Sequence, residues 1–140
     1  MLNRGAAHAP SEDDRRQARI TAASETARQQ WRNALLVDQT RAWMSIGENE
    51  AGVLGAMVTM LTIAGFAHAY DTKSSDTPDM NIIRGAVSAA TQCMAAGGTV
   101  SVADARAFSA AAARADAILA KASIKAISYA AESIRAAVGL

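Results

Sequence analysis

The stretch AGVLGAMVTMLTIAGFAHAY (residues 51–70) decides the fold, because it is the longest run of the chain without a formal charge. Twenty residues span about 30 Å as an α-helix, which suits either a core helix or a membrane span. Twelve of the twenty are Gly, Ala, Thr, His or Tyr, which contribute little to membrane insertion. We therefore interpret the stretch as the central helix of a soluble protein, and we keep a transmembrane helix as the alternative.

Small side chains recur along this stretch at helical spacing. Gly52, Gly55, Thr59 and Thr62 fall on one face of a helix. Such a face lets a second helix approach closely, in a membrane or in a soluble bundle. We expect these four residues to pack against another helix or a partner. On this basis, Gly55→Leu would overpack the contact and destabilise it by about 1–3 kcal/mol.

The rest of the chain also reads as helix, with capping residues between the periodic stretches. Ser11 with Asp14 and Ser101 with Asp104 form capping pairs, and Pro78 suits a first helical position. We predict an all-α bundle of four or five helices around the central apolar helix. Residues 1–10 are expected to be flexible and 11–140 to form one domain, with helices at about 12–45, 50–70, 78–96 and 102–138. The last is one long helix or two helices joined near residues 122–123.

The composition favours helices with a thin core. Alanine accounts for 35 of the 140 residues, 16 of them after residue 100, while aromatic residues make up 4%. Alanine is the best helix former but buries little area, so we expect a homo-oligomer to supplement the core. The net charge of +1 gives no field that would attract DNA or RNA. A lone Cys93 and no apolar leader predict a cytoplasmic protein, or an inner-membrane one under the alternative.

No group of residues predicts catalysis or metal binding. His8 and His68 have no Cys, Asp or Glu at ligand spacing, and Cys93 has no histidine that could act as its base. We therefore expect a protein that is not an enzyme and that holds no cofactor and no metal. Trp31 and Trp43 are the largest apolar anchors. We expect Trp31 in the core and leave Trp43 open between core and interface.

Three acids lie in the loop DTKSSDTPD (residues 71–79). Asp71, Asp76 and Asp79 lack the alternation and central glycine of a calcium-binding loop. We interpret them as a solvated turn, which could meet a basic surface on a partner.

One segment carries a resemblance. In residues 81–119, Arg84-Gly85-Ala86-Val87, Thr91-Gln92, the Gly97-Gly98 turn and Ala103-Asp104 resemble small helical proteins of unknown role from temperate phages and prophages of proteobacteria. The resemblance implies an accessory phage gene and supplies no activity or functional residues.

Together these observations predict a non-catalytic protein-interaction protein with a partner of unknown identity. A phage accessory factor that acts on a host protein, for example against a defence system, is the more specific form of this prediction. The alternatives are a small membrane protein for lysis or the envelope, with residues 51–70 as its span, and a structural subunit of a helical assembly.

Overall fold

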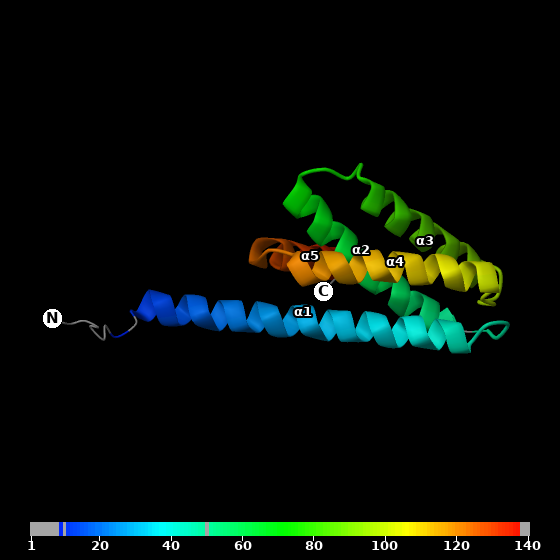
Figure 1. The fold of residues 1–140 in the computed structure, drawn as a ribbon, viewed down its shortest axis with the longest axis horizontal. Coiled ribbons are helices and arrows are strands. Elements are labelled where there is room, and N and C mark those ends of the chain that lie inside the picture. Colours follow the sequence, from blue (N-terminus) through cyan, green and yellow to red (C-terminus); the bar gives the residue numbers. More distant parts are fainter. Residues whose placement is uncertain (1–8, 10, 50, 138–140) are drawn as a thin grey trace.

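A computed structural model describes residue 9 and residues 11–49 and 51–137. Successive helices from the first to the fourth run in opposite directions (Figure 1). The predicted all-α bundle is confirmed. The segment 1–10, predicted to be flexible, lies outside the described residues except for Ala9. The five helices are α1 (Glu12–Met44), α2 (Ala51–Thr72), α3 (Pro78–Ala95), α4 (Val102–Lys121) and α5 (Ile124–Ala137).

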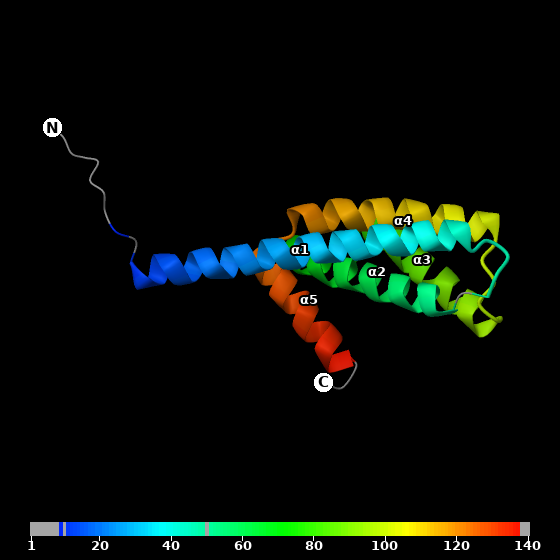
Figure 2. The ribbon, with the colours of Figure 1, turned by 90° about the horizontal axis from the view of Figure 1, so that it is seen from below.

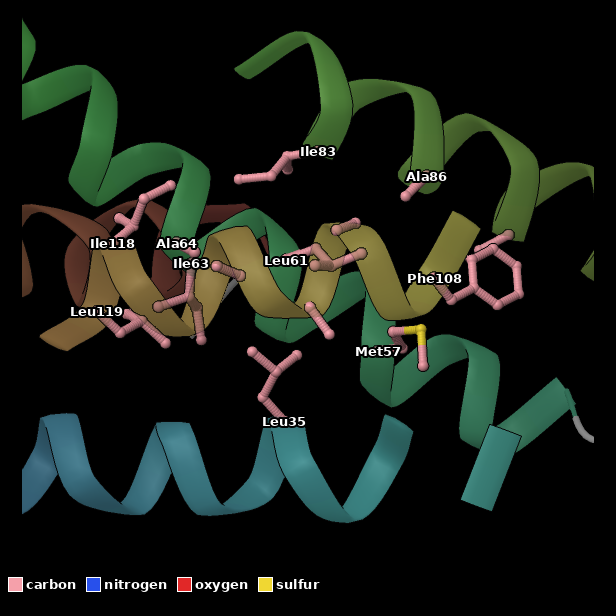
Figure 3. Packing of buried hydrophobic residues seen from close by; sticks show 14 of the residues in the cluster. Leu35, Met57, Leu61, Ile63, Ala64, Ile83, Ala86, Phe108, Ile118 and Leu119 are labelled. Atoms are coloured by element: carbon pink, nitrogen blue, oxygen red, sulfur yellow. The ribbon is translucent and has the colours of Figure 1, made fainter. Parts of the chain in front are cut away.

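Helix α2 is the central helix of the bundle, because it contacts each of the other four. Leu54, Met57 and Leu61 of α2 are fully buried, with 0% of their surface exposed. In Figure 3, Leu35 of α1 and Ile83 of α3 point toward the core from opposite sides. Each such large side chain stabilises the fold by about 1.5–3 kcal/mol relative to an exposed one. The protein itself thus covers one side of the apolar stretch, while Val58, Met60 and Phe66 are only half-buried.

Helix α1 is longer than the bundle, and its amino-terminal part extends past the other helices (Figure 2). Every residue from 11 to 20 is exposed. Ser11 caps the helix: its Oγ accepts from the Asp14 amide at 3.0 Å, and the Asp14 carboxylate accepts from the Ser11 amide at 3.3 Å. Glu12 pairs with Arg15 at 3.0 Å. Local contacts of this kind, worth at most about 1 kcal/mol per exposed ion pair, hold this part without tertiary packing.

Two turns lie against each other at one end of the bundle. The Gly47 amide donates to the Val100 carbonyl at 2.8 Å, and Asn49 forms a β-bridge with Thr99. The contact joins the α1–α2 turn to the α3–α4 turn. It also fixes where α2 and α4 begin, so the two helices start side by side.

The stretch 102–138 forms two helices, the second of the alternatives that the sequence left open. Ala122 is extended (φ −61°, ψ 138°), and Ser123 Oγ accepts a backbone N–H of the first turn of α5 at 3.1 Å. The Asp71 carboxylate accepts from the Ser123 amide at 3.0 Å and from its hydroxyl at 2.5 Å. Arg28 of α1 donates to the Ala122 carbonyl at 3.0 Å. Contacts from α1 and α2 therefore hold the joint between α4 and α5.

Helix α5 covers only part of α2. Tyr129 of α5 packs on Phe66 and Tyr70, with ring centroids 6.1 and 5.2 Å apart. α5 begins near the end of α2 and then diverges from the α2 axis (Figure 2). None of the described residues covers the outer side of the first half of α2 at Gly52 and Gly55.

The uncovered glycines correct one expectation. A Cβ atom at Gly52 or Gly55 would meet no atom of another described element within 4 Å, so a first side-chain carbon at Gly55 does not overpack a helix contact as expected. We expect Gly55→Ala to raise the free energy of unfolding by about 0.5–1 kcal/mol, because alanine loses less backbone entropy in a helix. Urea denaturation measures this change. Gly85→Ala on α3, also in open space, is the matched control. Destabilisation at Gly55 alone would mean that a second molecule covers this face.

Candidate functional site

Helix α1 turns large apolar side chains toward solvent. Helical spacing places Leu36, Val37, Thr40, Trp43 and Met44 on one side, which we call the outer face of α1. Leu36 is 61% exposed and Met44 is 78% exposed. Apolar side chains that gather on the open face of a helix mark a contact with another molecule. The outer face of α1 is therefore the candidate site of this protein.

The opposite face of α1 carries polar groups into the bundle. Ser24, Asp38 and Ser45 are buried there beside Leu35 and Ala42. An ordinary surface helix turns its apolar stripe inward and its polar side chains outward. α1 departs from this arrangement on both faces, so core packing alone does not explain its sequence.

Trp43 lies at the edge of the outer face. Its indole Nε1–H donates to the Ser109 hydroxyl of α4, which also accepts from Gln39 Nε2 at 3.0 Å. The ring is 38% exposed. Trp43 is thus a surface residue that α4 holds in one orientation, and a fixed aromatic side chain of this kind is typical of interface anchors. Trp31, which we expected in the core, is half-buried and packs against it.

A groove of about 330 Å³ runs between α1 and α4 beside the outer face. Leu36 belongs to both, and Leu35 also lines the groove. Arg32 pairs with Asp116 across it at 2.8 Å. Amide side chains supply further donors and acceptors along its edge, namely Gln29, Asn33 and Gln39. The arrangement offers apolar contact with hydrogen bonding beside it, which suits a protein surface better than a reaction centre.

The acids of the loop have different environments. The Asp71 carboxylate accepts hydrogen bonds from Ser123 at the α4–α5 joint. Asp79 forms an ion pair with Arg114 at 3.4 Å. Asp71 and Asp79 line one pocket of about 250 Å³ with His68. Asp76 is exposed and does not line this pocket. The structure therefore gives Asp71 and Asp79 contacts within the chain and leaves Asp76 as the acid most open to a partner.

The small-residue face lies on the outside of α2. Gly52 and Thr59 are exposed, while Gly55 and Thr62 are half-buried. Thr59 Oγ1 donates to the Gly55 carbonyl at 3.1 Å, and Thr62 Oγ1 donates to the Val58 carbonyl at 2.7 Å. These hydroxyls donate within their own helix. We expected Gly52 and Gly55 to pack against another helix of the chain or against a partner. The described helices do not cover them, so contact with a partner is the role that remains.

His68 and Cys93 each contact a polar side chain of the chain. His68 Nε2 lies 2.9 Å from Thr77 Oγ1 in the following loop. Cys93 Sγ donates to the Asp104 carboxylate at 3.2 Å. Burial and then Asp104 raise the pKa of the Cys93 thiol to about 11. A thiol with this pKa is protonated at neutral pH, whereas a nucleophilic cysteine needs the thiolate.

Asp38 is a buried carboxylate on the inner face of α1. It is 7% exposed, and no described residue donates a hydrogen bond to it. Burial raises the pKa of Asp38, and the charge of nearby Arg41 acts in the opposite direction. Partial desolvation of the carboxylate disfavours its ionised form in the folded chain.

We expect Asp38→Asn to stabilise the protein at pH 7 by about 1–2 kcal/mol, since the amide removes the buried charge. The pKa of Asp38 is higher in the folded chain than in the unfolded chain. The proton therefore stabilises the fold at low pH, and this contribution is lost as the pH rises through the folded-state pKa. The advantage of the variant should shrink as the pH falls from 7 toward 4. Urea denaturation across this range, with the exposed Asp13→Asn as control, measures it. A constant advantage would contradict this account.

Two properties of the described residues bear on membranes and metals. α2 is the one described helix that is long and apolar enough to cross a membrane, by length and composition. Core helices of soluble proteins share these properties, so the evidence for a span is weak. The described part of the chain contains no group of three His, Cys, Asp or Glu side chains that could hold a metal ion.

Comparison with protein-family models, curated proteins and solved structures found no match.

Proposed function

We propose that this protein works by binding another protein through the outer face of α1, without catalysis. The exposure of Leu36, Val37 and Met44 is the observation that supports this proposal. Burying apolar surface stabilises a complex by about 25 cal/mol per Å², and these side chains bury little in the chain itself. Trp43, held by Ser109, would anchor the contact.

We propose more specifically that the partner is a protein of the host cell. The resemblance of residues 81–119 to phage and prophage proteins favours an accessory factor that acts in the host cytoplasm, for example on a defence protein. A second copy of the chain is the other partner that this face could take. Two-fold pairing of α1 around Thr40 would bring Leu36 of one copy near Met44 of the other.

The test replaces the apolar side chains and retains helix propensity. The double variant Leu36→Gln with Met44→Gln should weaken partner binding by about 30-fold and change the free energy of unfolding by less than about 1 kcal/mol. Ser88→Gln with Thr91→Gln is the control, since both positions are exposed on α3, which does not contact α1. Sedimentation equilibrium measures pairing between copies.

A photoreactive amino acid at position 40 identifies a host partner in cells, with position 91 as the matched site. The proposal requires a cross-linked protein at position 40 that is absent at position 91 and is lost in the Gln variant. Equal labelling at both positions, with no self-association, would contradict it.

A membrane protein is the second candidate, favoured by a different observation. Within α2, an 18-residue window has a mean hydropathy of 1.6 and 39% of its residues buried, and Gly52 and Thr59 lie on its bare side. In a membrane, small residues at this spacing pair helices. Fractionation without detergent separates the candidates: recovery only in the membrane pellet would favour the span, and recovery in the supernatant would favour the soluble interaction protein.

A further inference from the structure

A second groove, remote from the outer face of α1, lies where α2, α3 and α5 meet. Its volume is about 330 Å³. Most of its surface is apolar and comes from the three helices, chiefly from Phe66, Met80, Ile83, Val87 and Tyr129. A cavity of this size with apolar walls and few polar groups is typical of small-molecule sites.

One cation borders this groove, beside the uncharged polar residues Thr62 and Ser75, and a second cation lines the adjoining hollow. Arg84 borders the groove, with its guanidinium hydrogen-bonded to the Ser75 carbonyl and 3.5 Å from Asn81 Oδ1. Past Ala69 and Tyr129, which belong to both cavities, the groove continues into a second hollow that Lys73 lines. Among the described residues, no carboxylate lies within 4 Å of either cation, Asp76 of the adjoining loop included. The apolar groove is thus bordered by two cationic side chains, Arg84 at its edge and Lys73 in the adjoining hollow.

The backbone at Lys73 is a second, independent observation. Lys73 follows the end of α2 with φ +55°, the left-handed conformation in which helices usually place glycine. A side chain with a Cβ is less stable than glycine in this conformation. The residue in this position is a lysine, and it lines the hollow beside the groove.

We propose that this groove binds an unbranched aliphatic carboxylate of medium chain length. The alkyl chain lies along the apolar walls between α2 and α3, and the carboxylate lies between Arg84 and Lys73. Arginine and lysine both bind carboxylates through charge-assisted hydrogen bonds. The tether to Ser75 leaves Arg84 donors free to bind a ligand.

Calorimetric titration with decanoate below its micelle-forming concentration tests the proposal on the full chain. Wild type should bind decanoate at one saturable site, with octanoate about 15-fold weaker, since each of the two missing methylenes contributes about fourfold in affinity. Decyltrimethylammonium, with the same tail and the opposite charge, should bind at least about tenfold more weakly. Absence of saturable binding, or equal binding of the ammonium compound, would overturn the proposal.

Variants locate the site. Arg84→Gln with Lys73→Gln should weaken decanoate binding by about tenfold, while Arg106→Gln on α4 leaves it unchanged. Lys73→Gly should raise the melting temperature and weaken binding, which separates loss of the charge from loss of the fold. Gly65→Leu fills the groove, because a Cβ there meets Met80 Cε at an ordinary 3.5 Å. Decanoate binding by a folded Gly65→Leu variant at wild-type strength would overturn the assignment. Binding to phosphatidylglycerol vesicles without binding to decanoate would replace it with a membrane surface.

Discussion

Leu61→Ala is expected to lower the free energy of unfolding by about 2–5 kcal/mol. Leu61 is fully buried on the central helix, so truncation removes its transfer free energy and leaves a cavity among four neighbouring helices. Small side chains dominate this core, and few large ones can move to fill the gap. Urea denaturation of the detergent-free protein, followed by circular dichroism, measures the loss.

Leu36→Ala is the matched control for this measurement. The same chemical change on the outer face of α1 should alter the free energy of unfolding by less than about 0.5 kcal/mol, because Leu36 is largely exposed. A loss below about 1 kcal/mol for Leu61→Ala, or equal losses for the two variants, would contradict the assignment of α2 as the core helix.

Gly98→Ala should destabilise the protein by about 2–4 kcal/mol. Gly98 has φ +83°, and a Cβ atom there would lie 2.4 Å from Asn49 Oδ1 and 3.1 Å from the Ala51 amide nitrogen. The left-handed conformation alone costs alanine about 1–2 kcal/mol, and displacement of the neighbouring turn adds to it. This turn contact fixes the start of α2, so the effect should appear as a lower melting temperature.

Gly97 separates the energy of the left-handed backbone from the energy of the close contact with Asn49. Gly97 also has a positive φ, +108°, but a Cβ atom there has no other heavy atom within 4 Å. Gly97→Ala should therefore cost only the conformational part, about 1–2 kcal/mol. Equal losses at the two positions would mean that the close approach of Asn49 to Gly98 has no energetic effect.

The sequence predicted the elements that depend on local chemistry. Ser11, Pro78 and Ser101 begin helices as their capping chemistry indicated. The apolar stretch became the central helix, because a helix that is apolar nearly all round is stable in water only when other helices cover it. These features need no knowledge of distant contacts.

The joint between α4 and α5 depends on distant contacts. Neither Gly nor Pro interrupts the stretch 102–138. The break at Ser123 is held by Asp71, 52 residues earlier, and by Arg28, 94 residues before Ala122. The sequence left one helix or two open, and the tertiary structure decides between them.

The outer face of α1 was missed for a related reason. Apolar residues at helical spacing along α1 include Leu35 and Ala42, which face the core, whereas Leu36 and Val37 lie outside this stripe and face solvent. Of the residues of the outer face, only Trp43 was among the candidate site residues. The signal was present as apolar residues on both sides of α1 together with Asp38 on the buried side. Which side faces solvent follows from the docking of α2 and α4, which the sequence of α1 does not contain.

Backbone hydrogen exchange of the detergent-free protein tests most directly whether α2 is buried by its own chain. We expect the slowest exchange at the α2 amides of residues 54–67, and fast exchange in the uncovered part of α1 over residues 13–23, because only the former are packed on several sides. Exchange of residues 54–67 as fast as that of residues 13–23 would contradict the central claim.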